Sequence, residues 1–393
     1  MSNNRALNFQ KGRCPIKSPA FFLCFFVLVI VTSTLTYCKH PEEIKEVSCS
    51  SLLVDSITFP FNKIDFGSVI YGENRKSNMY FYSDGDYLRC IRYNGDGKPL
   101  DTIKYPASIS SMLTGFYPIT KDSFAILTHQ QLFIYAAKSK KIHVFNLPIK
   151  GFRFEGYRFA GSPLEVCDSL AFFFRYEDTL IINTQKNLEL YLDSSHHEMV
   201  FNLNRDRAEN IKAGEFPKEI YGRNSYYSVS ISRCINKEKH ELIYTYPHSK
   251  NIYIFNYLNK TLKKITVQDP VFISNDTFDF NKVGDFDYIT KYQVENCRFR
   301  ALKYNKFRKE YYMPVVYKSN YEIPNSDEVV RFIDKPWSIL VLDSNFSIKE
   351  KINFPGKKYN FDRILPLQKG VLVGYYSNIK SKKDSSKYAV FEF

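Results

Sequence analysis

The chain has 393 residues, of which 44% are hydrophobic, and it carries a formal net charge of +14. This length suits one large or two ordinary domains, and so apolar a composition excludes a mainly disordered protein. Tyr and Phe number 30 and 34 against a single Trp. Because aromatic side chains favour pleated, half-buried surfaces, the composition predicts an all-β fold.

The first 37 residues predict an export signal. Residues 1–17 contain four basic residues and no acid, and residues 20–31 form an unbroken apolar run. A basic region followed by an apolar core of about 7–15 residues is typical of a secretory signal. A membrane-spanning helix needs ~20 apolar residues, which is more than this run supplies. We therefore assign residues 1–37 as a signal peptide.

A processing site follows the apolar run. Leu35-Thr36-Tyr37-Cys38 resembles a bacterial lipobox, in which the cysteine becomes the acylated first residue, although Tyr37 stands where a small residue is usual. We expect Cys38 to be lipidated, residues 38–50 to be a tether and residues 51–393 to be the folded domain, held at the membrane by its acyl chains. The alternative is an ordinary signal peptide, or an uncleaved anchor, with an incidental cysteine.

The residues after Cys38 bear on localisation. Lys39 and the pair Glu42-Glu43 loosely resemble the signal that sends some lipoproteins to the cell surface. We expect a location in the cell envelope, as an outer-membrane lipoprotein, and leave open whether the protein faces the surface or the periplasm.

Charge and cysteine usage limit the partners. Removal of residues 1–37 takes away four basic residues and lowers the net charge from +14 to +10. The basic clusters, at 138–141, 357–358 and 380–383, fall at expected hairpin turns. In an exported protein such clusters meet anionic lipid or polysaccharide, or are solvated loops, and we favour solvated loops over any nucleic-acid role. Five cysteines follow Cys38, and none of them are close to one another in the sequence: Cys49, Cys90, Cys167, Cys234 and Cys297. We interpret them as buried free thiols rather than as disulfides or a zinc site.

The body of the chain repeats a four-stranded unit. Paired apolar runs flank short turns, as in 87–93 and 100–105 around Asn94-Gly95-Asp96-Gly97, and Asn-Gly and Asp-Gly supply the positive φ that tight hairpins need. Further outer hairpins are expected at 131–147, 187–203, 251–267 and 337–354. Four-stranded units of about this period are typical of β-propellers.

The ends of the chain predict how the ring closes. The last unit offers only three strands, at 363–367, 370–376 and 387–393, whereas residues 52–59 form a spare strand. Supplying that N-terminal strand to the last blade leaves no exposed sheet edge. We therefore predict a β-propeller of six four-stranded blades, with a β-sandwich pair or an irregular β-solenoid as the alternatives.

The export signal, the lipobox-like site, the Phe- and Tyr-rich strands and the stretch 297–312, CRFRALKYNKFRKEYY, together resemble a known family. It is an uncharacterised family of six-bladed β-propeller lipoproteins, a domain of unknown function, from Gram-negative anaerobes of the Bacteroides type. Tyr304-Asn305 stands where Tyr-Asp is more usual in that family. The resemblance implies the fold and a lipidated Cys38, and it implies no catalytic residues.

Two candidate metal sites have simpler interpretations. The paired His196-His197, with Asp193 and Glu198 nearby, falls in an expected turn, where such polar residues are ordinary. Residues 279–287 faintly resemble a calcium loop, but Val283 and Thr290 occupy positions where a calcium ligand is required. We expect a loop between two blades there, with Asp285 and Asp287 as adventitious ligands at most, and no metal or cofactor.

The sequence contains no Gly-x-Ser-x-Gly, Gly-x-x-x-x-Gly-Lys or His-Glu-x-x-His motif. The first hypothesis is therefore a lipid-anchored binding protein, not an enzyme, that presents loops to an unknown protein, peptide or glycan. The alternative is an exported hydrolase or lyase with acids at the propeller channel, since such carboxylates converge in space rather than in sequence. A third hypothesis is a structural subunit of an envelope complex.

Overall fold

A computed structural model describes the chain over residues 44–60, 79–84, 89–109, 113–128, 130–147, 152–153, 164–174, 176–177, 186, 198–211, 213, 215, 217, 231–269, 272, 276–282, 284–376 and 386–393. Residues 45–393 form one compact unit, separate from residues 1–44. The predicted signal peptide and Cys38 lie outside the described residues. No described helix is long and apolar enough to cross a membrane.

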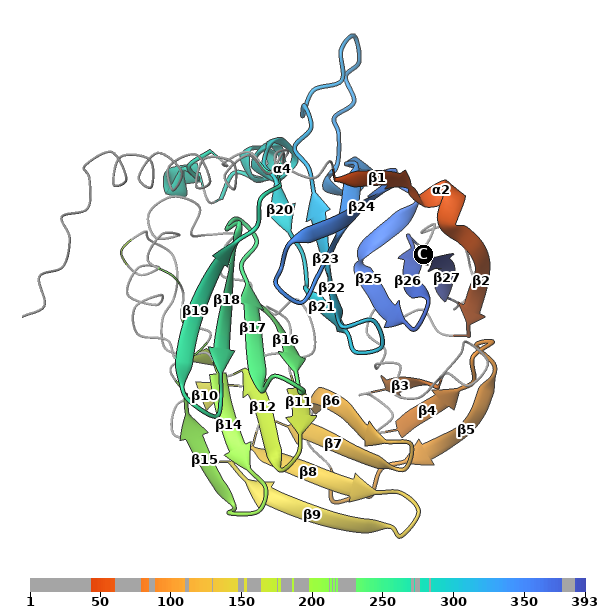
Figure 1. Ribbon diagram of the computed structural model, residues 1–393, viewed down its shortest axis with the longest axis vertical. Helices are drawn as coiled ribbons and strands as arrows, with labels where there is room; N and C mark the ends of the chain where they lie inside the picture. The colour runs from red at the N-terminus through yellow and green to blue at the C-terminus, as the bar shows by residue number, and fades with distance from the viewer. Residues whose placement is uncertain are drawn as a thin grey trace, which may run out of the picture. The chain divides into compact units, whose positions relative to one another are not determined.

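The compact unit is a six-bladed β-propeller, which confirms the predicted fold class (Figure 1). In blades 1 to 4 the strands follow one another in the chain and neighbours are antiparallel, whereas blades 5 and 6 each add a strand from the N-terminal end of the chain. Blade 1 contains three described strands, β3 (Tyr80–Asp84), β4 (Arg89–Tyr93) and β5 (Pro99–Lys104). Blade 2 contains β6 (Leu113–Thr120), β7 (Ser123–Thr128), β8 (Gln131–Ala136) and β9 (Lys141–Asn146).

Blades 3 and 4 follow the same pattern. Blade 3 contains β11 (Leu164–Cys167), β12 (Leu170–Phe174), β14 (Glu198–Asn202) and β15 (Arg207–Asn210). A separate two-stranded sheet pairs β10 (Phe152–Arg153) with β13 (Tyr176–Glu177). Blade 4 contains β16 (Ser232–Asn236), β17 (Glu241–Thr245), β18 (Asn251–Asn256) and β19 (Thr261–Thr266).

Blade 5 is the most elaborate. Its inner edge consists of two short strands, β20 (Arg298–Phe299) and β21 (Lys303–Asn305), which both pair with β22 (Glu310–Val316), and β23 (Trp337–Leu342) and β24 (Ile348–Phe354) complete it. A fifth strand, β1 (Lys45–Ser48), runs parallel to β24 along the outer edge. Residues 45–48, which fall within the predicted tether, are therefore part of a sheet.

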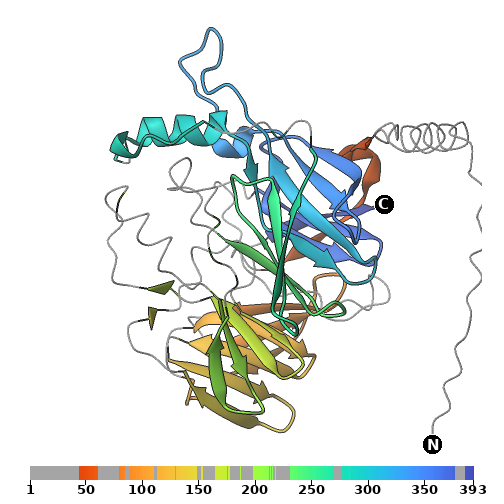
Figure 2. The same cartoon turned by 60° about the vertical axis from the view of Figure 1, so that its left-hand side comes forward.

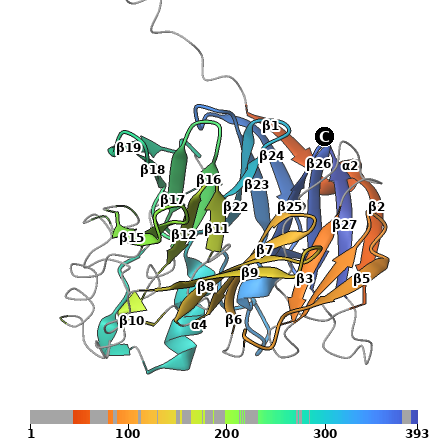
Figure 3. The same cartoon turned by 90° about the horizontal axis from the view of Figure 1, so that it is seen from below.

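Blade 6 contains β25 (Tyr359–Leu367), β26 (Gly370–Tyr375) and β27 (Ser386–Glu392), and its fourth strand is β2 (Leu53–Phe59) from the other end of the chain. Strand β2 is antiparallel to β27, with Ile57 opposite Tyr388, and Figure 3 shows the two side by side. The prediction that the N-terminal strand closes the last blade is confirmed. A one-turn helix, α2 (Cys49–Leu52), joins β1 to β2.

One sequence expectation for blade 3 is wrong. We expected β14 to form its hairpin with residues 187–192, which lie outside the described residues, but both neighbours of β14 are already taken by β12 and β15. The outer hairpin therefore turns at 203–206. The sequence pattern therefore predicted the wrong partner for β14, because strand pairing depends on contacts beyond the local sequence.

Six hydrophobic clusters hold the blades together, one at each junction between neighbouring blades. The junction of blades 6 and 1 contains Phe59, whose ring meets those of Tyr80, Tyr93 and Tyr388 edge-on at 5.1, 5.5 and 5.6 Å. The only Trp of the chain, Trp337, stacks on Phe354 at 4.2 Å between blades 5 and 6. The unusual aromatic content therefore fills the wedge-shaped spaces between sheets.

In blades 2 to 6, the tight turns and the long connections leave opposite ends of the strands. An antiparallel blade places its first and third turns at one end, and its second connection and its exit at the other. Blades 2 to 5 have both of these turns and blade 6 has only the first. All nine are short: 121–122, 137–140, 168–169, 203–206, 237–240, 257–260, 306–309, 343–347 and 368–369. We call this end the turn face.

The opposite end, the loop face, carries the long connections, which include 267–297 between blades 4 and 5 and 317–336 within blade 5. The first contains η4 (Phe280–Lys282) and α4 (Phe286–Glu295), and the second contains η5 (Phe332–Asp334). Figures 1 and 2 show α4 and the 317–336 connection projecting from the blades together.

Candidate functional site

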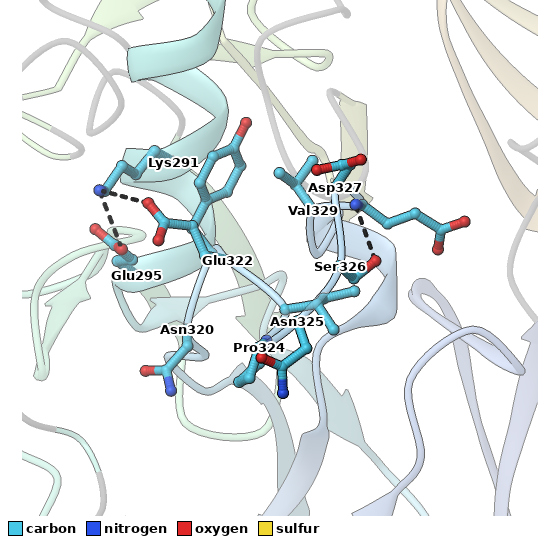
Figure 4. Close-up of a pocket in the computed structure, with 12 residues that line it drawn as sticks. Lys291, Glu295, Asn320, Glu322, Pro324, Asn325, Ser326, Asp327 and Val329 are labelled. Carbon is cyan, nitrogen blue, oxygen red and sulfur yellow. Dashed lines mark hydrogen bonds and ion pairs between the residues drawn. The ribbon is translucent and has the colours of Figure 1, made fainter.

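The loop face contains a pocket that no sequence motif or residue spacing predicted. It lies between α4 and the 317–336 connection, has a volume of about 850 Å³, and is lined by Lys291 and Glu295 on one side and residues 320–329 on the other (Figure 4). A single bridge between Glu322 and Val329 shapes the connection opposite the helix. The pocket is thus built from two insertions into a repeating scaffold, as binding sites on rigid scaffolds commonly are.

The helix begins where its capping residue dictates. The carboxylate of Asp285 accepts a hydrogen bond from the backbone N–H of Tyr288 at 3.0 Å, which is a standard helix start. This is the segment that the sequence suggested as a faint calcium loop and an inter-blade connection. It does join two blades, but the carboxylate of Asp285 serves as a cap. Among the described residues no group of three or more His, Cys, Asp or Glu side chains is arranged to hold a metal.

The end of α4 is fastened by a buried lysine. Lys335 is fully buried, and its ammonium group donates hydrogen bonds to the backbone carbonyls of Gln293 at 2.8 Å and Asn296 at 2.7 Å. Its charge also lies 5.1 Å from the ring of Phe332. Burial lowers the pKa of Lys335 to about 7. A cation at a helix C-terminus satisfies carbonyls that have no partner within the helix.

The charges around the pocket are mostly negative. Lys291 lies 3.9 Å from Glu295 and 3.8 Å from Glu322, and both pairs are visible in Figure 4. Asp327 and Glu328 add two further acids to the lining. The side chain of Glu322 is 83% exposed, so the pairs with Lys291 are weak surface interactions and the groups remain available to a ligand.

A second cluster of charges lies between blades 3 and 4. Arg233 is fully buried and forms an ion pair with Glu198, which is buried as well, and Nε of Arg233 lies 3.8 Å from Glu165. The hydroxyl of Tyr244 donates to Glu198 at 3.1 Å. Four strands, two from each blade, thus supply one cation, two acids and a phenol.

Burial perturbs the titration of this cluster. It raises the pKa of Glu198 to about 7, and it raises the pKa of Glu165 despite the nearby charges of Arg233, Lys303 and Lys237. Burial opposes the charge of Arg233, but the two facing carboxylates leave its pKa above the ordinary value. Perturbed carboxylates in a cleft are a recognised indication of an active site.

The geometry nevertheless favours a structural role for Glu198. Glycoside hydrolysis requires two carboxylates that both reach the substrate, and the side chain of Glu198 has no exposed surface, whereas that of Glu165 is 15% exposed. A buried pair whose hydrogen bonds are met locally fixes the packing of blades. Only Glu165 is accessible to a substrate.

The remaining sequence candidates divide between described and undescribed residues. Cys38 and His196-His197 lie outside the described residues, and so does Asp193. All five expected thiols are buried and free, which confirms that interpretation: Cys49, Cys90, Cys167, Cys234 and Cys297. Sequence reasoning missed the α4 pocket and Lys335. The Asp285-Phe286-Asp287 start of α4 was the available signal, since Asp before an apolar residue often caps a helix.

Comparisons with known proteins support the fold. No family model matches the sequence, and no curated protein matches it. The structure is similar to that of a DUF4221 family member from Bacteroides vulgatus, with a TM-score of 0.66, 15% identity, and coverage of 86% of this chain and 97% of the other.

Two weaker similarities differ in kind. A protein from Bacteroides fragilis whose name marks it as a candidate exported protein gives a TM-score of 0.46 at 11% identity, over 89% of this chain and 99% of its own. A gluconolactonase from Xanthomonas campestris gives 0.43 at 10% identity, over 88% and 93%. Of the three similarities, that to the DUF4221 family member alone supports the propeller fold, and at 15% identity it supports no function, because one fold hosts many functions.

Proposed function

We propose that this protein is an exported, lipid-anchored binding protein of the cell envelope that recognises its partner, a protein, peptide or glycan, with the loop face. The single observation that supports this most directly is the α4 pocket. Two insertions, absent from the plain four-stranded repeat, meet at one face and are locked together by Lys335. A rigidly held, solvent-open pocket is pre-organised for binding.

Site-specific photocrosslinking in intact cells tests this proposal. A photoreactive amino acid at Ser326, in the pocket lining, should yield a discrete crosslinked product. The same amino acid at Asn345, in the 343–347 turn of the turn face, is the matched control and should yield no crosslinked protein, peptide or glycan. Equal labelling from both positions, or products from Asn345 alone, would refute recognition by the loop face.

A second candidate function is supported by Glu165. Its side chain is 15% exposed, and burial raises its pKa above the ordinary value for Glu. A carboxyl group that holds its proton more tightly can act as a general acid. An exported hydrolase or lyase would then act at the propeller axis. Glu165→Gln separates the two functions, because it should abolish hydrolysis of any substrate that the wild type cleaves and leave crosslinking at Ser326 unchanged.

The lipid anchor at Cys38 is part of the proposal and rests on the lipobox-like site and on the family resemblance. Fatty-acid labelling of wild type and Cys38→Ala tests it, with protease treatment of intact cells in parallel. Labelled protein that is cleaved from outside would be a surface lipoprotein, and labelled but protected protein would face the periplasm. If the Cys38→Ala variant is labelled and fractionates like the wild type, Cys38 is not the anchor.

A further inference from the structure

The turn face carries a large excess of positive charge. Its nine turns in blades 2 to 6 contain eleven Lys or Arg residues and five Asp or Glu residues. The basic residues are Lys121, Lys138, Lys140, Arg205, Lys237, Lys239, Lys260, Lys306, Arg308, Lys309 and Lys369. All except Arg308 are exposed to solvent. By contrast, described residues 276–297 and 317–336 of the loop face contain nine acids and five basic residues.

Contacts between the turns show that they form one continuous surface. Lys239 donates to the carbonyl of Ser344 at 2.9 Å, which links blades 4 and 5. Lys237 donates to the carbonyl of Val166 at 2.8 Å, which links blades 4 and 3, and its charge lies 5.5 Å from the ring of Tyr117 in blade 2.

Blade 6 joins the same surface through blade 5. Asn305 at the end of β21 donates to the carbonyl of Leu367 at 2.8 Å, just before the 368–369 turn. These turns contain only two to five residues each, so none of them projects far from the surface that they form.

The acids of the turn face do not neutralise it. Asp122 is engaged by Arg92 at 2.9 Å, Glu238 by Lys309 at 3.0 Å, and Asp343 accepts backbone N–H groups of its own turn. Glu238 thus offsets one turn-face lysine, Lys309, in an exposed pair that solvent screens. Eleven cations against five acids still leave an excess of six positive charges in these turns. Like charges gathered on one face produce a potential that attracts anionic surfaces.

Three of the lysines occupy backbone positions that favour other residues. Lys140, Lys260 and Lys309 have φ of 55, 62 and 56° at the ends of their turns. Gly and Asn adopt this left-handed conformation at lower energy than lysine does. The other two four-residue turns end in the same conformation, at Asp206 and His240. Lysine fills this position in three of the five turns although it costs stability there, which is consistent with a use for its charge.

An apolar residue in the same surface distinguishes between anionic partners. Leu258 lies in the 257–260 turn beside Lys260 and is 63% exposed. Leucine among lysines suits the boundary between headgroups and acyl chains, where apolar burial and attraction to anionic lipid act together. A soluble polyanion offers nothing to the leucine.

We propose that the turn face docks on an anionic lipid surface, with Lys140, Lys260 and Lys309 contacting headgroups and Leu258 reaching the interface. This inference concerns the face opposite the pocket and holds whichever ligand the loop face takes. It revises our expectation that the cluster at 138–141 is only a solvated loop. Docking by this face would leave the loop face directed away from the bilayer.

Vesicle flotation of the full chain tests the proposal. The probes are vesicles of phosphatidylcholine alone and of phosphatidylcholine mixed with anionic phosphatidylglycerol. The apolar run at 20–31 is common to all variants, so the informative quantity is the ratio of binding to the two vesicle types. The turn-face variant is Lys140→Asn, Lys260→Asn and Lys309→Asn, in which Asn suits the left-handed backbone.

The matched control removes three lysines from the loop face, namely Lys250→Asn, Lys318→Asn and Lys357→Asn. It includes the same substitution at a left-handed position, since φ of Lys357 is 65°. Each lysine near an anionic surface contributes roughly fivefold to binding, so the turn-face variant should lose about a hundredfold of the preference for anionic vesicles. The control variant should retain that preference. The preference for anionic vesicles should also decrease when the salt concentration is raised from about 0.1 M to about 1 M.

Three results would overturn the proposal. The first is a turn-face variant that floats like the wild type, and the second is a loop-face variant that loses as much binding. The third is wild-type protein that shows no preference for anionic vesicles but binds soluble dextran sulfate, because the turn face would then recognise polyanions in solution. Leu258→Asn separates the lipid from the charge contribution and should weaken vesicle binding without changing dextran sulfate binding.

Discussion

Lys335 binds the backbone carbonyl of Asn296 at 2.7 Å, and this contact joins the connection of blade 5 to the residue that ends α4. The side chain of Asn296 donates to the carbonyl of Tyr292 at 2.8 Å. Lys335 adds the cation that the last turn of α4 lacks, where the sequence places Glu295 instead. The position of α4, which forms one wall of the pocket, thus depends on a side chain of the 317–336 connection, which forms the other wall.

Substitution of Lys335 by Met should release α4. It leaves two carbonyls without their donor, a loss of about 1–3 kcal/mol each if they stay buried, although it also removes a buried charge. We expect faster amide exchange across 286–295, measured by hydrogen–deuterium exchange. Lys291→Met, on the same helix but 46% exposed, is the control and should leave that exchange unchanged. Equal exchange in wild type and Lys335→Met would mean that other contacts hold the helix.

The lowered pKa of Lys335 also predicts how the stability of the protein depends on pH. Its folded pKa is lowered to about 7 from 10.5, so between these values the unfolded chain binds the proton and the folded chain does not. Stability should therefore rise with pH from about 7 to about 10.5 in the wild type, and this contribution should be absent from Lys335→Met. Urea unfolding at a series of pH values measures it. Parallel curves for the two proteins would contradict the assignment.

Glu198 should act in the opposite sense. Burial raises its folded pKa to about 7 from 4.5. Its contribution to stability is present below about pH 4.5 and is lost as the pH rises through about 7. Glu198→Gln keeps a hydrogen-bonding group beside Arg233 and Tyr244 and should flatten the unfolding free energy across this window. The control is Glu322→Gln, whose 83% exposed side chain should leave the wild-type pH dependence intact.

Most of the repeat could be predicted from the sequence because its signals are local. Asn94 to Gly97 form the turn between β4 and β5, and the turns at 138–140 and 258–260 lie between predicted strands. The closing strand β2 was predicted by counting, since a three-stranded last unit leaves an edge that needs a partner. Register follows from alternation once the turns are placed.

The parts that could not be predicted depend on distant contacts. Strand β1 has the short polar sequence KEVS and becomes a strand only because the edge of β24 is available, with Lys45 and Glu46 meeting Glu350 and Lys351. The inner edge of blade 5 divides into two short strands, β20 and β21, that share the partner β22. The pairing of Arg233 with Glu198 joins residues 35 positions apart, and no local pattern reports such a contact.

The closing strand should determine the stability of the whole ring. Phe59 is fully buried at the junction of blades 6 and 1, and Phe59→Ala should lower the unfolding free energy by about 3–5 kcal/mol, whereas Val54→Ala, on the same strand but 55% exposed, should change it by less than about 0.5 kcal/mol. The fluorescence of Trp337 reports the next junction, between blades 5 and 6. If the blades unfold as one unit, Trp337 fluorescence and far-ultraviolet circular dichroism should shift together to lower urea in Phe59→Ala. A shift in circular dichroism with an unchanged Trp337 transition would instead show that the 6–1 junction opens by itself, and that β2 closes the ring without coupling its blades.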